Sequence, residues 1–425
     1  MSISYQDGQT SAGQPAMEHS VPLRRIIPAP VVTRALVGIN AAVFVAMVLS
    51  GISPTEPNSA QLLQWGANWG PYSLGDQPWR LLTSNYLHIG IIHIALNMWC
   101  LWDLGQLSEF IFGRWTLLLI YTACGLAGSI ASLWWHPMVI GAGASGAIFG
   151  LAGALITALY LGKLPFPRQG FQKTLRSLLT FAGYNLLFGA VGRGIDNSAH
   201  VGGLVMGLAL GAVIGQFLTD SRESRAGRER FVFMLAAIAL VAAGALVKHQ
   251  RGDVVFLVQG RDALAKGQPD AAIKDLQTTV AKNPKDNAAL VLLGNAYLQK
   301  KDYVQAEAVL KRAEANDPSD AAVQYNLGLM YQATKRFEPA RQIFSKLAQS
   351  NPKDDDVWMM LGSSLDGLGR ESEAAQAYQQ ALSLNPKNGE AYRRLGMAYR
   401  AQGMKAESDA AFEKAKELGS ATKPQ

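Results

Sequence analysis

Residues 141–161 read GAGASGAIFGLAGALITALYL, an uncharged and largely apolar run with a serine set between small residues near its start. A helix that crosses a bilayer needs about 20 mostly apolar residues to span about 30 Å of hydrocarbon. This run is short for a span, but runs of similar character lie on both sides of it up to about residue 248. We therefore interpret this part of the chain as a bundle of membrane-spanning helices.

Seven runs have the composition of spans, although the fourth and fifth are short. They are Val31–Ser50, His88–Leu107, Trp115–Trp135, Ser145–Leu161, Leu175–Val191, Ala199–Phe217 and Phe231–Val247. Arg24 and Arg25 before the first run give it the outline of a signal peptide, but no small-x-small cleavage pattern follows it. An uncleaved first span is therefore favoured.

Lysine and arginine are concentrated in alternate loops. If the N-terminus is cytoplasmic, the inner segments carry Arg24, Arg25, Arg114, Lys163, Arg168, Lys173, Arg176, Arg222, Arg225, Arg228 and Arg230. The outer loops between spans carry Arg80 and Arg193. Because positive residues accumulate on the cytoplasmic side, seven spans place the C-terminal half outside the cytoplasm. In a bacterium this predicts a multi-pass protein of the inner membrane.

The overall composition argues against several classes of protein. The formal net charge of the 425 residues is +7, but the basic residues do not form one stripe, so we expect no nucleic-acid partner. Cys100 and Cys124 both lie inside apolar runs, which argues against a disulfide framework or a zinc site. No metal and no organic cofactor is implied.

Three polar clusters mark the starts of the second, fourth and sixth runs. They are His88, His93 and Asn97; Gly143-Ala144-Ser145-Gly146; and Ala199-His200-Val201-Gly202-Gly203. These three spans run from outside to inside in the topology above, so the clusters share a shallow depth on the outer side. Ionisable groups at membrane depth are costly and usually functional. The sequence therefore predicts one site built from three spans.

The residue types in these clusters suit acyl transfer. A neutral imidazole can take the proton of a serine, and Ser145 at a helix start has unpaired backbone N–H groups near it. His93 and Asn97 are four apart, hence on one helix face, and can add donors for an oxyanion. The spacings Gly146-x3-Gly150 and Gly203-x3-Gly207 are typical of helices in close contact, which would bring His200 to Ser145.

Together with Trp79-Arg80 in the first loop, these motifs resemble the signature of rhomboid proteases over about residues 30–217. The resemblance implies a dyad of Ser145 as nucleophile and His200 as general base. It also implies an oxyanion hole lined by His93 and Asn97. Gly143, Gly146 and Phe149 are expected to support the site, Phe149 by packing on the catalytic histidine. The seventh span resembles the six-plus-one subgroup of the family.

Other polar residues near the motifs receive structural interpretations. Asp196 lies four positions before His200 and could suggest a triad, but a loop carboxylate beside Arg193 is interpreted as an exposed ion pair. The resemblance implies a site that works without an acid, so Asp196 is left out of it. His88 is expected to fix the first loop. Glu109 and Arg114 are interpreted as anchors of the loop between the second and third spans.

Beyond about Asp253 the chain repeats with a 34-residue period. Glycine recurs at Gly260, Gly294, Gly328, Gly362 and Gly396, and proline at Pro284, Pro318, Pro352 and Pro386. This period predicts five tetratricopeptide units, each a pair of helices, stacked as a solenoid with a concave surface for a peptide or a partner helix. A spacer or a dimerisation arm is the alternative.

We divide the chain into a cytoplasmic segment (1–30), a six-helix catalytic core (31–217), a basic loop with the seventh span (218–250), the repeats (253–418) and a tail (419–425). The sequence predicts an all-α protein with serine endopeptidase activity on membrane-anchored proteins. Expected partners are transmembrane substrates, membrane lipid, a protein or peptide for the repeats, and a second copy of the chain. The rival hypotheses are a catalytically silent rhomboid-like protein that binds clients, and a transporter or channel with a docking domain.

Overall fold

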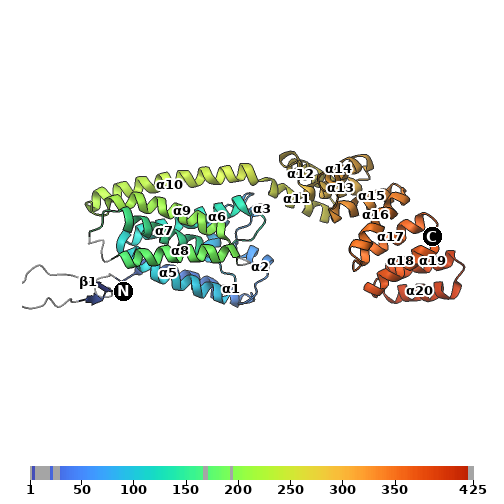
Figure 1. Ribbon diagram of the computed structural model, residues 1–425, viewed down its shortest axis with the longest axis horizontal. Coiled ribbons are helices and arrows are strands. Elements are labelled where there is room, and N and C mark those ends of the chain that lie inside the picture. Colours follow the sequence, from blue (N-terminus) through green and yellow to red (C-terminus); the bar gives the residue numbers. More distant parts are fainter. Residues whose placement is uncertain (1, 5–19, 23–28, 166–170, 192–194, 420–425) are drawn as a thin grey trace, which may run out of the picture. The chain divides into compact units, whose positions relative to one another are not determined.

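The computed structural model describes residues 2–4, 20–22, 29–165, 171–191 and 195–419. The chain divides into two compact units, Met1–Val255 and Phe256–Gln425. The predicted all-α class, a membrane bundle followed by tetratricopeptide helices, is confirmed (Figure 1). The strands of the described residues are β1 (Ser2–Ser4) and β2 (Ser20–Pro22), which pair antiparallel.

Seven long helices of the first unit correspond to the seven predicted spans. They are α1 (Val31–Leu49), α5 (Ile91–Phe112), α6 (Arg114–Trp135), α7 (Ser145–Leu161), α8 (Gln172–Val191), α9 (Asn197–Ile214) and α10 (Arg222–Arg251). Short helices fill the loops: α2 (Ser59–Gln64), α3 (Gly70–Ser73), α4 (Arg80–Thr83) and the 3-10 turns η2 (Ser84–Tyr86) and η4 (Gly215–Phe217).

Five of the seven helix starts differ from the prediction, and the differences at α5 and α10 have an identifiable local cause. Helix α5 begins at Ile91, because Gly90 has φ +96° and ends a turn that holds His88 outside the helix. Helix α10 begins at Arg222, where the Ser221 side chain caps the backbone N–H of Ser224. The basic residues that we placed in a loop before the seventh span therefore form the first turns of α10.

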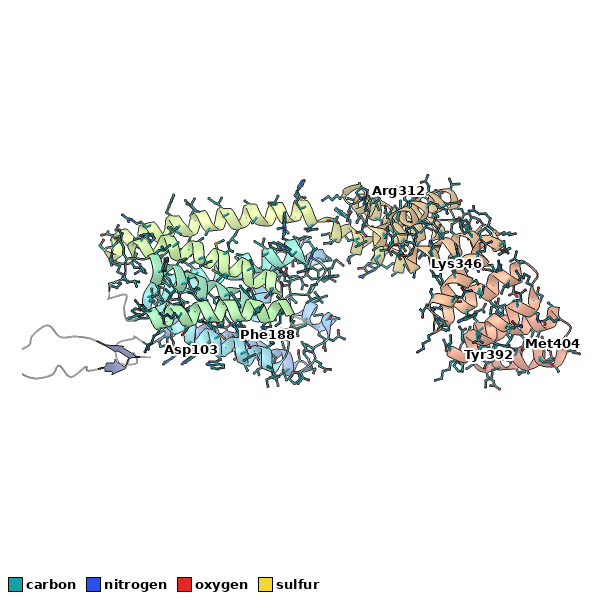
Figure 2. The ribbon with its side chains drawn as sticks, in the orientation of Figure 1. Asp103, Phe188, Arg312, Lys346, Tyr392 and Met404 are labelled. Carbon is teal, nitrogen blue, oxygen red and sulfur yellow. The ribbon has the colours of Figure 1, made fainter. Side chains whose placement is uncertain are left out.

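Four of these helices are long and apolar enough to cross a membrane: α1, α6, α10, and α9 extended through η4. Helix α5 joins them if it is counted together with α4 and η2, from which it is bent by 92°. Helix α7 is apolar but has 17 residues. Large apolar side chains such as Phe188 of α8 lie exposed on the outside of the bundle, as expected for a surface that faces lipid (Figure 2).

Helices α7 and α9 are in backbone contact along their glycine stripes. A Cβ atom on Gly203 would overlap the carbonyl oxygen of Gly146, and one on Gly207 would overlap that of Gly150. The absence of side chains lets the two backbones approach, which supplies van der Waals packing where lipid offers no hydrophobic drive. The two stripes predicted to bring the fourth and sixth spans together do face each other.

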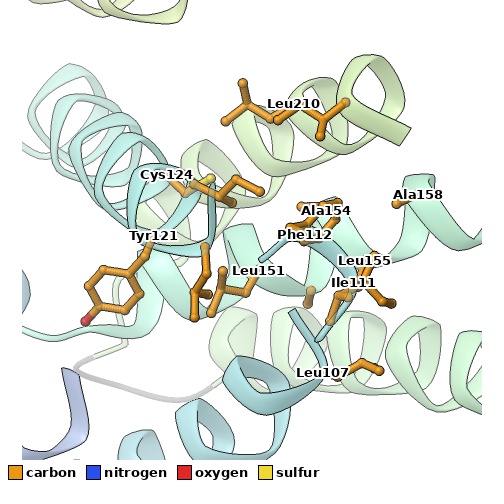
Figure 3. Packing of buried hydrophobic residues seen from close by; sticks show 14 of the residues in the cluster. Leu107, Ile111, Phe112, Tyr121, Cys124, Leu151, Ala154, Leu155, Ala158 and Leu210 are labelled. Carbon is orange, nitrogen blue, oxygen red and sulfur yellow. The ribbon is translucent and has the colours of Figure 1, made fainter. Parts of the chain in front are cut away.

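Buried apolar side chains of α5, α6, α7 and α9 form the core around this contact (Figure 3). Leu107 and Phe112 come from α5, Tyr121 from α6, Leu151 from α7 and Leu210 from α9. Both cysteines are free. Cys124 is buried in this core among apolar side chains.

The second unit consists of five helix pairs. They are α11 (Asp253–Ala265) with α12 (Pro269–Lys282), α13 (Asn287–Gln299) with α14 (Tyr303–Asn316), α15 (Ala321–Ala333) with α16 (Phe337–Ser350), α17 (Asp355–Gly367) with α18 (Glu371–Leu384), and α19 (Gly389–Ala401) with α20 (Lys405–Glu417). Each recurring glycine marks a crossing: a Cβ atom on Gly328 would meet the Phe344 ring, and one on Gly362 the Tyr378 ring. The repeat prediction is confirmed in its period, and the recurring glycines lie at the crossings within the pairs.

Candidate active site

Ser145 is the first residue of α7 and is held there by the segment that precedes it. Asn68 and Gly141 exchange two backbone hydrogen bonds of 2.9 and 2.8 Å, and the Gly143 N–H donates to the Ser84 carbonyl at 2.9 Å. Gly143 has φ +145°, a conformation open to glycine and strained for other residues. This pinned segment leads into α7 so that the half-exposed Ser145 side chain stands at the helix start.

His200 lies in the first turn of α9 and is nearly buried. Its imidazole stacks on the ring of Phe149, with centroids 4.2 Å apart and 9° between the planes. A Cβ atom on Gly146 would lie 3.2 Å from the carbonyl oxygen of Ala199, the residue before His200. The starts of α7 and α9 therefore touch, with Ser145 and His200 at the same end of the helix pair.

Among the described residues, no hydrogen bond joins the Ser145 hydroxyl to the His200 imidazole. The Nδ1 atom of His200 is buried and likewise has no hydrogen-bond partner among them. Hydrogen bonds between a nucleophile and its base are often loose before substrate binds. The structure thus places the two side chains at one end of adjacent helices, and their direct contact remains a prediction.

His93 of α5 lies against Gly143, in the segment that precedes Ser145. A Cβ atom on Gly143 would lie 3.1 Å from Nε2 of His93 and 3.8 Å from Oγ of Ser145. The backbone N–H of Ile89 donates to Nδ1 of His93 at 3.4 Å, which assigns the proton of the neutral ring to Nε2. This nitrogen is then a donor on the side of Gly143 and Ser145.

Asn97 lies one turn further along α5 and is buried, with its amide donating to the His93 carbonyl at 3.1 Å. No contact with Ser145 is described for it, so its place in an oxyanion hole remains a prediction. His88 is fully buried beside His93, with ring centroids 5.3 Å apart. That position agrees with its expected structural role.

A small polar cavity of about 40 Å³ lies beside Ser145. Its polar side chains are those of Asn68, Ser84, Asn85, Ser129, Ser132, Ser145 and Asp196. Ser129 accepts a hydrogen bond from Asn85 at 3.2 Å, whereas the buried Ser132 hydroxyl has no hydrogen-bond partner among the described residues. A water needs about 10–15 Å³ of such space and two to four polar partners, so the cavity can hold water.

Sequence reasoning missed most of this cavity. Ser129 and Ser132 are three apart on α6, which puts them on one face, but isolated serines in an apolar run give little signal. It also gave Asp196 a different role. Asp196 caps α9, because its Oδ1 accepts hydrogen bonds from the Ala199 N–H at 3.1 Å and from the Ser198 hydroxyl. The proposed partner Arg193 lies outside the described residues.

Arg80, noted above as an outer-loop charge and as part of a motif, is buried in the first loop. Its Nη1 donates to the carbonyls of Leu63 and Ala67 at 2.6 and 3.1 Å, and its Nε donates to Gln77 at 2.7 Å. The guanidinium satisfies carbonyls on both sides of a turn and so holds the loop that carries Asn68. Among the described residues, no group of three or more His, Cys, Asp or Glu side chains could bind a metal.

Comparison with known proteins identifies the fold and its relatives. The Rhomboid domain profile matches residues 75–217, and tetratricopeptide profiles match residues 257–321, 299–363, 368–403 and 389–418. The chain is 30% identical to the rhomboid protease AarA of Providencia stuartii over 197 residues, which are 41% of this chain and 69% of AarA. The chain belongs to the rhomboid family.

A second rhomboid relative extends the similarity beyond the Rhomboid domain. The rhomboid protease GluP of Bacillus subtilis is 31% identical over 291 residues, which are 67% of this chain. These residues are 54% of GluP, so this rhomboid chain spans about half the length of that relative.

A solved structure of MamA is 29% identical over 39% of the chain and 98% of MamA, with a TM-score of 0.35. Together with its apolar helices, the rhomboid relationship makes this a multi-pass membrane protein.

Proposed function

We propose that this rhomboid protein is an intramembrane serine endopeptidase that hydrolyses peptide bonds of membrane-anchored proteins. The observation that carries the proposal is the contact between the starts of α7 and α9, which puts Ser145 and His200 at one end of the bundle beside His93 and a polar cavity. Two relatives bear the name rhomboid protease, which agrees with this function.

The residues have distinct roles in the proposed reaction. His200 takes the proton of the Ser145 hydroxyl as Ser145 attacks the carbonyl carbon of the peptide bond. The negative charge that develops on the carbonyl oxygen is stabilised by Nε2–H of His93 and by unpaired N–H groups at the start of α7. His200 then gives its proton to the leaving amine, and an acyl ester on Ser145 remains. We expect Asn97 to support the same oxyanion.

The membrane arrangement is part of the proposal. The charge asymmetry of the loops places the N-terminus in the cytoplasm and the starts of α5, α7 and α9 toward the outer face. For a bacterial inner membrane, cleavage then occurs near the outer face and the repeat unit lies outside the cytoplasm. Reporter fusions at Lys163 and after Val255 test this, since a cytoplasmic repeat unit would reverse the assignment.

The tetratricopeptide unit is proposed to bind a protein or peptide partner. Each of the five stacked helix pairs buries the apolar contact between its own two helices. The stack leaves a continuous surface exposed, and such a surface is the usual basis of peptide recognition by these repeats. We expect the unit to recruit substrates or partner proteins to the membrane enzyme.

A serine-reactive fluorophosphonate probe tests the catalytic proposal. Wild-type protein in detergent or bilayers should be labelled, and Ser145→Ala should not be labelled. Ser145→Ala and His200→Ala should each lower cleavage of a transmembrane substrate by about 10³-fold or more, because nucleophile and base act as a unit. Unchanged cleavage in Ser145→Ala would exclude the proposal.

The alternative is a catalytically silent rhomboid-like protein that binds client helices. The missing hydrogen bond between Ser145 and His200 is the observation that keeps this candidate open. It predicts client binding without probe labelling or cleavage. Co-purification of clients with both wild type and Ser145→Ala, with no proteolysis by either, would favour it.

A further inference from the structure

Asp196 faces the same cavity as the proposed nucleophile. The cavity lining contains both Asp196 and Ser145, together with five other polar side chains from the first loop and α6. One oxygen of the carboxylate, Oδ1, is engaged by the cap of α9. Among the described residues, no group donates a hydrogen bond to the other oxygen, Oδ2. The Asp196 side chain is part-buried, and water in the cavity that it lines can donate to this carboxylate.

The Ser132 hydroxyl independently indicates that the cavity holds water. This side chain is 2% exposed, lines the cavity and has no hydrogen-bond partner among the described residues. Buried hydroxyl groups are rarely left unpaired, and ordered water commonly supplies the missing bond. The volume of about 40 Å³ accommodates more than one water beside Ser145.

The proposed reaction consumes one water after the first bond is cut. The acyl ester on Ser145 reacts when the oxygen of a water bonds to the acyl carbon and the bond from that carbon to Oγ of Ser145 breaks. One proton of the water passes through His200 to Oγ of Ser145, and the product leaves as a carboxylic acid. This water must reach the acyl carbon from a position next to Ser145.

We propose that Asp196 is a positioning residue for this hydrolytic water: it accepts a hydrogen bond from the water and holds it in the cavity against the Ser145 ester. The inference rests on the proposed protease function and assigns a role to the second half of the reaction. Asp196 acts through the water and through α9, and it makes no contact with the peptide.

Asp196→Asn separates the water-binding role from the capping role. Asparagine is as good a helix N-cap as aspartate, so its carbonyl oxygen keeps the bond to Ala199 N–H. Its amide group then faces the cavity and donates where the carboxylate accepted. Asp196→Ser, a second good cap without a carboxylate, gives an independent variant if the asparagine protein folds poorly. Asp286→Asn makes the same exchange at the N-cap of α13, where Asp286 accepts from Ala289 N–H at 3.0 Å, and controls for its effect on stability.

The experiment compares the two half-reactions in the full-length protein. Fluorophosphonate labelling reports attack by Ser145 without water, and Asp196→Asn should label within about twofold of wild type because the cap is kept. Turnover of a transmembrane peptide substrate should fall about 10- to 100-fold, the effect of losing a hydrogen bond to a charged group. Mass spectrometry after acid quench should find the acyl ester on Ser145 in the variant and little of it in wild type.

The outcomes are distinguishable. Equal loss of labelling and turnover would show that Asp196 acts on Ser145 or His200 and would overturn the proposal. So would wild-type turnover without ester accumulation in both cap-preserving variants. A wild-type protein that neither labels nor cleaves would instead refute the protease function on which the inference rests.

Discussion

The Phe149 ring lies parallel to the His200 imidazole, with 4.2 Å between ring centroids and 9° between planes. The residues belong to α7 and α9, and the contact restricts the imidazole on one face. Ser145 is one turn before Phe149, so the ring orients His200 relative to the serine through the geometry of a single helix.

Phe149→Leu should lower turnover about 2- to 10-fold, because an aromatic stack contributes about 0.5–1.5 kcal/mol beyond its buried area. Most of the loss should fall on kcat, since the stack orients the base and is not expected to touch substrate. Phe112→Leu is the matched control: this equally buried side chain lies at the far end of α5. Comparable losses of activity in the two variants would mean that Phe149 matters only for packing.

Gly203→Ala tests whether contact between α7 and α9 creates the site. The added Cβ would overlap the Gly146 carbonyl, so the helices must separate and carry His200 away from Ser145. We expect cleavage and fluorophosphonate labelling to fall at least about 10-fold. Gly183→Ala is the control, because a Cβ on this α8 glycine would meet nothing within 4 Å. If Gly203→Ala labels as fast as Gly183→Ala, close packing of the two helices is not what assembles the dyad.

Glu109 of α5 caps the start of α1 and should contribute to stability. Its carboxylate accepts from the backbone N–H groups of Val32 and Thr33 at 3.0 and 2.9 Å and from the Thr33 hydroxyl at 2.8 Å. Glu109→Ala leaves these groups unpaired at a part-buried position, at a cost of about 1–3 kcal/mol. Thermal unfolding in detergent should therefore show a lower midpoint for Glu109→Ala than for the exposed control Glu56→Ala. Equal midpoints would contradict the capping role.

The sequence could predict Ser145, His200 and His93 as one site because each opens a run whose direction follows from loop charges. It predicted both ends of α7, at Ser145 and Leu161. It placed the start of α10 too late along the chain. The apolar run begins at the edge of the hydrocarbon layer, whereas the helix begins before it in the basic segment. There, Ser221 caps it and Arg225 pairs with Glu229 at 2.8 Å.

The cavity could not be predicted in the same way. Asn68, Ser132 and Asp196 come from a loop, α6 and the start of α9, and only tertiary packing brings them to Ser145. Asp196 looked like a surface carboxylate because the loop before it contains Arg193. Its capping of α9 depends on where the helix begins, which is among the least certain features of a sequence.

The repeat unit should have a pH-dependent stability that originates at Asp366. Burial raises the pKa of Asp366, and burial and the nearby Asp366 carboxylate raise the pKa of Glu371. Tyr378 donates to Oδ2 of Asp366 at 2.5 Å, and the positive charge of Arg394 partly offsets the effect of burial on Asp366. At these two carboxyl groups the folded unit thus binds protons more tightly than the unfolded chain does.

Because the folded state holds more protons at Asp366 and Glu371, the stability that these two groups contribute should fall as pH rises above the ordinary carboxyl pKa values and through the raised ones. Asp366→Asn keeps an oxygen that can accept from Tyr378 but removes the buried charge. Thermal unfolding of residues 256–425 is compared between wild type and the variant from about pH 4 to pH 7.5, and the difference between their midpoints should grow as pH rises. The variant's gain over wild type should be largest at the neutral end. Glu338→Gln, on the exposed face of α16, removes a carboxylate whose pKa is lowered to about 2 by hydrogen bonding to Arg341, and should not reproduce the gain. Parallel unfolding curves for Asp366→Asn and wild type across this range would mean that ionisation of Asp366 is not linked to folding.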